Sequence, residues 1–292
     1  MRGFLAPLRE GVQGLSSIEM TIKPQSDAVS SPELLRGDID GVALLSLNRP
    51  ARRNTLTEAM LAALHAEFDA IAQDKSVRAV VLSHNGPAFS SGHDMKEMQA
   101  HRTGPDRGRA YFKDLMERCA ALMMKVQQIP QPVIAAVEGV AAAAGCQLVA
   151  TCDLAIASET ARFSTPGVHI GLFCSTPMVA LSRNVANKHA MEMLLLGDAV
   201  SADEAYRIGL VNRVVPAGKA SEEASSLARK IAGQSTLIVK HGKQAFYRQR
   251  EMPLADAYKL TVEVMVENMM ARDNEEGFKA FIEKRDPNWE DR

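Results

Sequence analysis

Short β-like runs alternate with amphipathic helical stretches in the first part of this 292-residue chain. The β-like runs cover residues 41–47, 78–86, 132–139 and 154–158, and glycine, proline, asparagine or serine bounds each of them. Residues 55–73 and 109–129, which lie between these runs, repeat apolar side chains at helical spacing. Strands and helices that alternate in this way predict right-handed β-α-β crossovers and a layered α/β core.

From about residue 175 the pattern is helical throughout, with helices predicted over residues 201–209, 222–233, 254–272 and 275–285. We therefore expect a tail in residues 1–37, an α/β core in residues 38–200 and a C-terminal helical region in residues 201–292. The methionine-rich stretch at residues 265–270 is more typical of helix packing than of a binding surface.

Two helix starts carry a capping signal. Thr55 with Glu58, and Ser201 with Glu204, match the pattern in which a hydroxyl and a carboxylate three residues later satisfy the first amides of a helix. These pairs predict helices that begin directly after Thr55 and Ser201.

Charge and composition exclude several classes of protein. The net charge of −1 gives no basic field that would gather nucleic acid or anionic lipid. No apolar run approaches the ~20 residues that cross a bilayer. The four cysteines show no C-x-x-C pair or metal-ligand spacing, so we expect buried free thiols in a reducing compartment and no metal site: Cys119, Cys146, Cys152 and Cys174.

The first 20 residues lack the long apolar core of a secretory signal. Their arginines and serines resemble a transit segment, whereas Glu10 and the short hydrophobic stretch oppose one. The cytoplasm is therefore the expected location, and the mitochondrial matrix is the alternative if the tail is a transit segment.

The stretch GVAAAAGCQLVATCDLAIAS, residues 139–158, combines a run of very small residues with a single amide, Gln147. A β-like run leads into the alanines, and a buried helix is predicted to start after them. The first amides of a helix have no intrahelical acceptor and lie at the positive end of its dipole. Small residues let a ligand oxygen approach such amides, as an oxyanion hole requires, but they suit tight helix-to-sheet packing equally well.

A second loop, NGPAFSSGHDMKEM at residues 85–98, also follows a β-like run. It places Ser90–His93 before a short helix at residues 94–98, for which Asp94 is the expected cap. Two strand-to-helix transitions from neighbouring strands can aim two amides at one point. This arrangement suits a carbonyl whose oxygen becomes negative during a reaction.

Five segments, in this order and spacing, resemble the crotonase (enoyl-CoA hydratase/isomerase) superfamily: LNRPARRNTL, AFSSGHDMKEM, PVIAAVEGVAAAAGCQLVATCDLAIAS, FSTPGVHIGLF and SADEAYRIGLVNRVVP. The resemblance covers roughly residues 38–290. It implies an α/β fold with a crotonase (ClpP-like β-β-α) spiral core and a C-terminal helical trimerisation region. It further implies a homotrimer or homohexamer.

The resemblance also implies roles for individual positions. The family's oxyanion hole uses two backbone amides, which match His93 and Ala144. The loop Ser91–Lys96 matches the segment that holds adenine and pantetheine, Arg52 matches a basic position near the phosphates, and Lys284 matches a lysine that reaches a neighbouring subunit's coenzyme A. The ligand is an acyl-CoA thioester, with coenzyme A as part of the substrate and no other cofactor. The implied substrate-binding positions are Arg52, Leu56, Ser91, Gly92, His93, Asp94, Met95, Lys96, Ala144 and Lys284.

The chain departs from the family at the two catalytic glutamates of hydratases, whose positions are Gln147 and Gly167 here. Neither ionises near pH 7. Because a positioned acid or base contributes ~10²–10⁴-fold, efficient hydration by the usual route is not expected.

Three other side chains are candidate replacements for the glutamates: His93, His169 and Cys174. Each has an ordinary structural explanation, as a loop histidine, a packed or surface histidine and a buried thiol. Asp153 is expected in an ion pair or a cap rather than in catalysis.

Three functions therefore remain open. The first is an acyl-CoA enzyme that performs isomerisation, decarboxylation or thioester hydrolysis. The second is a non-catalytic acyl-CoA binding or regulatory protein. The third, an assembly subunit with a vestigial pocket, is disfavoured because Arg52, the 91–96 loop and Lys284 are all present. A dehydrogenase is excluded, since no G-x-G-x-x-G follows a β-like run.

Overall fold

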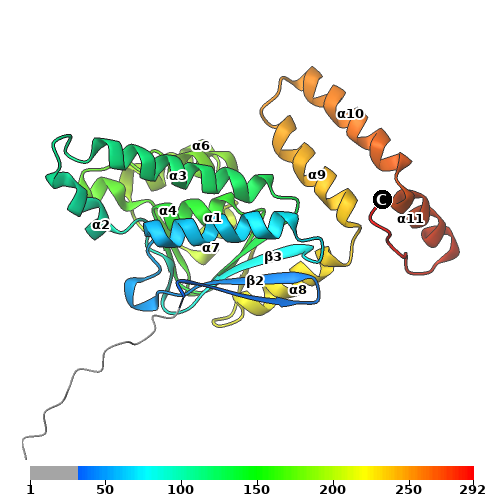
Figure 1. The fold of residues 1–292 in the computed structure, drawn as a ribbon, viewed down its shortest axis with the longest axis horizontal. Coiled ribbons are helices and arrows are strands. Elements are labelled where there is room, and N and C mark those ends of the chain that lie inside the picture. The colour runs from blue at the N-terminus through cyan, green and yellow to red at the C-terminus, as the bar shows by residue number, and fades with distance from the viewer. Residues whose placement is uncertain (1–31) are drawn as a thin grey trace, which may run out of the picture. The chain divides into compact units, whose positions relative to one another are not determined.

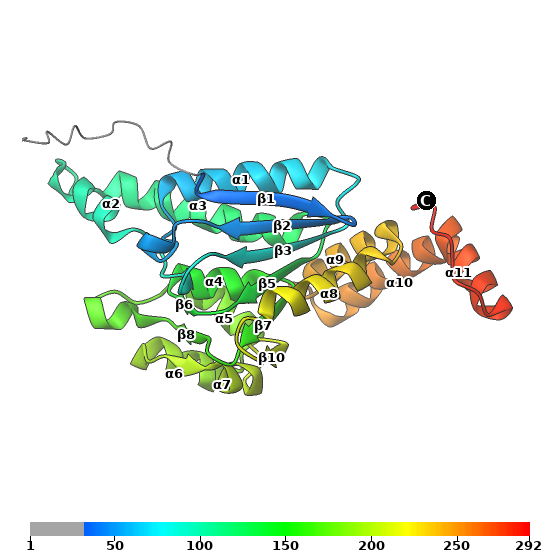
Figure 2. The same cartoon turned by 90° about the horizontal axis from the view of Figure 1, so that it is seen from below.

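A six-stranded sheet forms the centre of the computed structural model, which describes residues 32–292. Figure 2 shows several of these strands side by side. Strands β1 and β2 are antiparallel, and every other pair of neighbouring strands in this sheet is parallel. The strands, in spatial order, are β1 (Leu34–Ile39), β2 (Val42–Leu47), β3 (Ala79–His84), β5 (Val133–Val137), β7 (Leu154–Ser158) and β10 (Arg213–Val215).

In a second, four-stranded sheet, three of the strands follow directly on strands of the first sheet. Its order is β4 (Ala88–Ser90), β6 (Val140–Ala142), β8 (Arg162–Ser164) and β9 (Val200–Ser201). The chain thus passes from β3 to β4, from β5 to β6 and from β7 to β8, and helical structure follows each pair. These helical segments begin with α2 (Met95–Ala100), α4 (Ala144–Thr151) and the 3₁₀ turn η3 (Pro166–Ile170). This repeated β-β-α unit is the one that the resemblance implies.

Helices cover both faces of the six-stranded sheet. In Figure 1, α1 (Glu58–Gln73) and α3 (Arg109–Gln128) lie on one side and α8 (Ala220–Ala232) on the other. The predicted helical repeat of α1 is confirmed, because Met60, Leu64, Phe68 and Ile71 are all fully buried. Helix α8 presents an alanine at every fourth position, and these small side chains pack on the sheet: Ala220, Ala224, Ala228 and Ala232. Both faces are covered, so the strands are nearly continuous apolar runs.

The layers continue past residue 200. Strand β10 pairs with β7, and α8 packs against β3, β5 and β7, so the expected division at residue 200 does not coincide with a break in the packing. Three helices lie between β8 and β10 along the chain: α5 (Pro177–Asn184), α6 (Asn187–Leu196) and α7 (Ala202–Arg207). The last three helices are α9 (Thr236–Gln249), α10 (Leu254–Met270) and α11 (Arg272–Glu283). Of the expected tail, residues 1–31 lie outside the described residues, and residues 34–37 belong to β1.

One of the two predicted caps is confirmed and one is wrong. Ser201 caps α7, because its hydroxyl accepts a hydrogen bond from the Glu204 amide at 3.1 Å. Helix α1, by contrast, is capped by Thr57, whose hydroxyl accepts from the Met60 amide at 3.0 Å. Thr55 lies too early because Leu56 is still held in a β-bridge with His93, so the chain cannot turn into a helix until two residues later.

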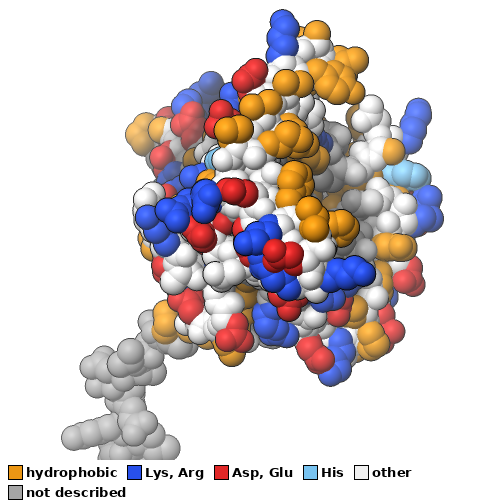
Figure 3. All heavy atoms as spheres, turned by 90° about the vertical axis from the view of Figure 1, so that its right-hand side faces the viewer, with side chains coloured by type: hydrophobic (Ala, Val, Ile, Leu, Met, Phe, Trp, Pro, Cys, Tyr) orange, Lys and Arg blue, Asp and Glu red, His pale blue; other side chains and the backbone are white. Residues whose placement is uncertain are grey.

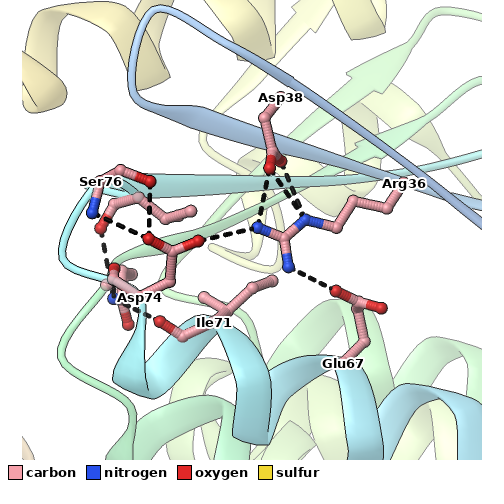
Figure 4. Close-up of polar contacts among 8 residues, drawn as sticks. Arg36, Asp38, Glu67, Ile71, Asp74 and Ser76 are labelled. Carbon is pink, nitrogen blue, oxygen red and sulfur yellow. Dashed lines mark hydrogen bonds and ion pairs between the residues drawn. The ribbon is translucent and has the colours of Figure 1, made fainter.

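A single guanidinium ties the edge strand β1 to α1. Arg36 lies among three carboxylates, as Figure 4 shows: Asp38, Glu67 and Asp74. The Arg36 nitrogens lie 2.6 Å from Glu67 and 3.3 Å from Asp74. Because β1 has only one neighbour in the sheet, these contacts supply a second attachment for the strand.

Asp153 has the structural role expected of it, since it anchors α9 to the body of the molecule. The Lys243 ammonium lies 2.7 Å from the Asp153 carboxylate and also donates to the carbonyls of Val126 and Gln131. The Tyr247 hydroxyl donates to the other Asp153 oxygen at 2.8 Å. This buried ion pair is fully hydrogen-bonded, as a charge removed from water needs to be.

Apolar side chains on α10 and α11 face outward, and Figure 3 views the molecule from the side of these helices. The stretch at residues 265–270 is helical but does not pack within the chain: Met265, Val266, Met269 and Met270 are 45–77% exposed. Phe278, Phe281 and Ile282 on α11 are also exposed. Within residues 32–292 no helix is long and apolar enough to cross a membrane.

Candidate functional site

The two loops singled out in the sequence meet at Gly92. A Cβ atom on Gly92 would lie 3.0 Å from the Ala143 Cβ and 3.3 Å from the Ala144 nitrogen, and the backbone there has φ +89°. Only glycine accepts both that conformation and that contact. Strand β4, which leads into the first loop, pairs with β6, which leads into the second. The sheet therefore brings the two loops together, and Gly92 lets them touch.

The alanine run serves tight packing as well as an open backbone. A Cβ on Gly145 would lie 2.3 Å from the Ser90 carbonyl oxygen, so the start of α4 is pressed against β4. Ala143, directly before α4, has φ +50° and ψ −118°, a conformation unfavourable for a residue with a side chain. The tight packing expected of the run is therefore confirmed, and this packing places the helix start beside Gly92.

Two backbone amides are left free at this meeting point. Within the described part of the chain, neither the His93 amide nor the Ala144 amide donates a hydrogen bond to a protein acceptor. Ala144 is the first residue of α4, where amides lack an intrahelical partner and the helix dipole is positive. A carbonyl or other electronegative oxygen is the group that such amides bind.

Residues 53–56 run parallel to the first loop and support it through backbone hydrogen bonds. The Ser91 amide donates to the Arg53 carbonyl at 3.0 Å, and the Leu56 amide donates to the Gly92 carbonyl at 2.8 Å. Leu56 is buried and forms the β-bridge with His93. Leu56 is therefore an interior support of the loop, whereas Arg52, Met95 and Lys96 are exposed beside it.

Asn54 is a supporting residue that the sequence reading did not identify. Its side chain is fully buried, accepts from the Arg49 amide at 2.6 Å, and donates to the carbonyls of Asn85 and Ala88 at 2.9 and 2.7 Å. These bonds join the turn before α1 to the ends of β3 and β4. The sequence signal for this role is the asparagine itself, which follows two arginines and precedes a threonine. Asparagine readily takes the left-handed backbone conformation found at Asn54, where φ is +49°.

Asp94 caps α2 as predicted. Its carboxylate accepts from the amides of Lys96 and Glu97 at 2.8 and 3.3 Å, and the Thr55 hydroxyl donates to it at 3.3 Å. Burial acts to raise the pKa of Asp94, but these hydrogen bonds, aided by the nearby Arg52, hold the pKa below its usual value. Asp94 is therefore an ionised structural carboxylate rather than a proton donor near neutrality.

The ring of His93 is packed inward. Its Nδ1 atom lies 3.3 Å from the Leu56 carbonyl oxygen, and its Nε2 atom is buried without a partner in residues 32–292. Burial lowers the pKa of His93, so the ring is neutral at pH 7. The amide of His93, rather than its imidazole, is exposed to the meeting point of the loops.

Gln147 and Gly167 are the positions at which the resemblance implies the glutamate pair of hydratases. Gln147 lies one turn into α4 with 4% of its surface exposed, and its Oε1 atom has no hydrogen-bond partner in residues 32–292. A Cβ on Gly167 would lie 2.6 Å from the Leu172 carbonyl oxygen and 2.9 Å from the Cys174 sulfur. The backbone of residues 172–174 therefore leaves no room for a side chain at position 167.

The other candidate proton carriers are engaged elsewhere. The Nε2 atom of His169 lies 2.7 Å from the Leu196 carbonyl oxygen at the end of α6, and the residue is exposed, so His169 has the surface position given above as its ordinary explanation. Burial raises the pKa of Cys174, which keeps its thiol protonated. All four cysteines are buried and free, as predicted. In residues 32–292 no three His, Cys, Asp or Glu side chains group as metal ligands.

Lys284 is not brought to this site within one chain. It ends α11 in a left-handed conformation, φ +54°, and is exposed. Figure 1 shows α11 on the far side of the described residues from α2.

Two cavities lie away from the loops. One of about 360 Å³ is lined by Asp153, Lys243 and Tyr247, whose polar atoms are already paired. One of about 190 Å³ lies beside α6 and α7.

The repeated β-β-α units and the two free amides at paired strand ends define a crotonase-type protein. The sequence profile of the enoyl-CoA hydratase/isomerase family matches residues 38–292, and the chain belongs to this family.

Among its relatives, enoyl-CoA hydratase domain-containing protein 3, mitochondrial, from Rattus norvegicus is 46% identical over 86% of this chain and 82% of that protein. The crystal structure of the human protein of that name superposes with a TM-score of 0.83 at 44% identity, covering 88% of this chain and all of that one. An enoyl-CoA hydratase from Mycobacterium smegmatis gives a TM-score of 0.85 at 50% identity, over 89% of this chain and 99% of that one. The crotonase fold implied by the sequence is thus confirmed.

Proposed function

We propose that this chain binds acyl-CoA thioesters, with the thioester oxygen held between the backbone amides of His93 and Ala144. The observation that carries the proposal is the contact of Gly92 with Ala143 and Ala144, beside which both amides lack an acceptor among residues 32–292. Two amides aimed at a carbonyl oxygen stabilise the negative charge that develops when the thioester forms an enolate or a tetrahedral species.

Coenzyme A is recognised, in this proposal, by the exposed edge of the same loops. Arg52 and Lys96 are exposed cations that flank the loop at Ser91–Asp94 and suit the phosphates. Met95, which is 64% exposed, offers an apolar surface to the adenine or pantetheine. Lys284 completes the site from a neighbouring subunit.

Efficient hydration of an enoyl thioester is not part of the proposed activity. Gln147 cannot transfer a proton, and Gly167 is closed in by Leu172 and Cys174. The ring of His93 is directed to Leu56, His169 to Leu196, and Cys174 is held protonated by burial. The glutamate pair therefore has no evident replacement among these side chains.

A non-catalytic acyl-CoA binding or regulatory protein is the second candidate. The observation that favours it is the buried Oε1 atom of Gln147, which has no partner within residues 32–292 and belongs to a group that offers only hydrogen bonds. An isomerase, decarboxylase or thioesterase of this family needs a base that the described site does not present.

Assembly as a homotrimer or homohexamer is proposed from the exposed apolar side chains of α10 and α11. Met270, Phe281 and Ile282 are 77–85% exposed in the single chain, and such a contiguous apolar face marks an interface. A second subunit would also bring Lys284 to the site. Light scattering of the purified protein tests this assembly.

For the location we propose the mitochondrion, on the names of two of these relatives. The rat and human proteins are named as mitochondrial, which supports the mitochondrial matrix over the cytoplasm for this chain. Fusion of residues 1–37 to a fluorescent protein distinguishes the two locations in cells.

The function is tested by titrating crotonyl-CoA and a longer saturated acyl-CoA into the protein by calorimetry, while the absorbance of crotonyl-CoA is followed in the same sample. Binding of both ligands without loss of the enoyl absorbance is expected. Binding with hydration above background would contradict the consequence drawn from Gln147 and Gly167. Absence of any binding would contradict the site itself.

A further inference from the structure

Residues 288–292 fold back onto the start of α11. The Asp273 carboxylate, in the first turn of that helix, accepts hydrogen bonds from the amides of Glu290 and Asp291 at 2.7 and 3.1 Å. The Asp273 amide donates to the Arg292 carbonyl at 3.2 Å. Figures 1 and 2 both show this end of the chain beside α11. Asp273 is only 1% exposed, so the two backbone amides supply the hydrogen bonds that its buried carboxylate requires.

Asp291 connects the same segment to the six-stranded sheet. Its carboxylate accepts a hydrogen bond at 2.7 Å from the amide of Thr236, the first residue of α9. It also lies 3.3 Å from the guanidinium of Arg78, which directly precedes β3 and donates to the Thr236 hydroxyl at 2.8 Å. Asp291 therefore links the start of α11 to the starts of α9 and β3.

Trp289 makes a second connection between α11 and the rest of the chain. Its indole nitrogen donates to the Gly233 carbonyl, between α8 and α9, at 2.9 Å. Its ring lies against Gly277 of α11, since a Cβ on Gly277 would be 3.4 Å from two ring carbons. One side chain thus contacts both α11 and the junction of α8 with α9.

Helix α11 buries little apolar surface of its own. Asp273 and Ala280 are its buried residues, whereas Phe278, Phe281 and Ile282 are 61–85% exposed. A helix of 12 residues is only marginally stable in water unless it packs against other parts of the protein. The orientation of α11 therefore depends strongly on the polar contacts that residues 288–292 provide.

The exposed apolar side chains of α11 belong to the face from which the assembly was proposed above. An interface forms most tightly when its surface is already held in the binding orientation, because less freedom is lost on association. We propose that residues 288–292 act as a clasp that fixes α11 in the orientation from which its apolar face binds a second copy of this chain. This inference rests on the proposed assembly and is independent of the acyl-CoA site.

The fluorescence of Trp289 reports on the clasp directly, because it is the single tryptophan of the chain. Asp291→Gly removes the carboxylate but keeps the backbone amide, and glycine accepts the φ of +57° found there. This variant is expected to increase the quenching of Trp289 fluorescence by acrylamide. It is also expected to weaken self-association by at least about tenfold, measured by light scattering over a range of protein concentrations.

Glu290→Gly is the matched control. It also replaces a carboxylate by glycine, but the Glu290 side chain pairs with Arg292 inside the clasp, and the amide that donates to Asp273 is kept. Quenching and self-association should both remain at their wild-type values. Phe281→Ser, which changes a side chain that is 85% exposed on the α11 face, should weaken self-association without changing the quenching, because the contacts of Trp289 lie within one chain.

The outcomes separate the clasp from the assembly. Wild-type self-association in Asp291→Gly, or weaker self-association without increased quenching, would overturn the role of the clasp and leave the assembly in place. Equal increases of quenching in Phe281→Ser and Asp291→Gly would show that the clasp depends on assembly, which is the reverse of the proposal. A wild-type protein that scatters light as a single chain would refute the assembly and this inference with it.

Discussion

Gly92 lies against Ala143 so closely that a Cβ on Gly92 would be 3.0 Å from the Ala143 Cβ. This contact holds the two strand-to-helix loops together and sets the spacing of the His93 and Ala144 amides. The spacing of those amides, rather than any ionisable side chain, is what the candidate site depends on.

Gly92→Ala is therefore expected to weaken acyl-CoA binding by at least about tenfold, because the loops must separate to admit the methyl group. Calorimetry with butyryl-CoA measures the effect. Gly218→Ala is the matched control, since Gly218 also has a positive φ, +79°, but no atom within 4 Å of an added Cβ. If both variants bound the ligand equally well, the contact with Ala143 would not be what positions the amides.

Gln147→Glu alone is expected to leave crotonyl-CoA hydration within about tenfold of the wild type, since one carboxylate does not replace an acid and base pair. Gly167→Glu is expected to lower the unfolding free energy by about 1–3 kcal/mol or more, because its Cβ has no room. The absorbance of crotonyl-CoA measures hydration by Gln147→Glu, and urea unfolding measures the stability of Gly167→Glu. Gly242→Glu, in a helix with open space at the Cβ, is the control for stability. Vigorous hydration by Gln147→Glu would show that a second proton carrier exists.

Asn54→Ala is expected to lower the unfolding free energy by about 2–3 kcal/mol, because it removes the hydrogen bonds of a fully buried side chain to the Arg49 amide and to the Asn85 and Ala88 carbonyls. The same change should weaken acyl-CoA binding, since segment 53–56 supports the Gly92 loop. Urea unfolding and calorimetry measure the two effects. Asn187→Ala, at an exposed position of α6, should change neither. Wild-type stability in Asn54→Ala would refute the supporting role.

Stability should decrease as the pH falls below about 6.5, the ordinary histidine pKa. Burial lowers the pKa values of His84 and His93, so the unfolded chain takes up protons in this window while the folded chain does not. His84 must stay neutral because its Nε2 accepts the Glu138 amide at 3.0 Å.

The expected loss is about 1.4 kcal/mol per pH unit for each such histidine, between its unfolded and its folded pKa. His84→Gln should reduce the pH dependence measured by urea unfolding at pH 5–8, and the exposed change His101→Gln should not. An unchanged slope in His84→Gln would show that His84 does not contribute.

Individual residues show which features of the fold depend on the local sequence pattern alone. Met60, Leu64, Phe68 and Ile71 were predicted as one helix face and are buried together, because a helix face depends only on spacing along the chain. Ser201 and Asp94 cap their helices for the same local reason. Thr55 failed as a cap because Leu56 is drawn into a bridge with His93, a contact across 37 residues that no local pattern contains.

The features of the candidate site also fall into two groups, those determined by the sequence and those decided by the tertiary structure. The amino-acid sequence by itself determined the alternation of strands and helices, the family and the two loops at residues 85–98 and 139–158, since each depends on residues that lie close together in the chain. The tertiary structure alone decided that Asn54 supports the loops, that His169 lies against Leu196, that Gly167 is closed in by Cys174, and that the Gln147 side-chain oxygen has no partner within residues 32–292. These properties depend on which distant groups share a space of a few ångströms, and close packing of the folded chain is what determines that.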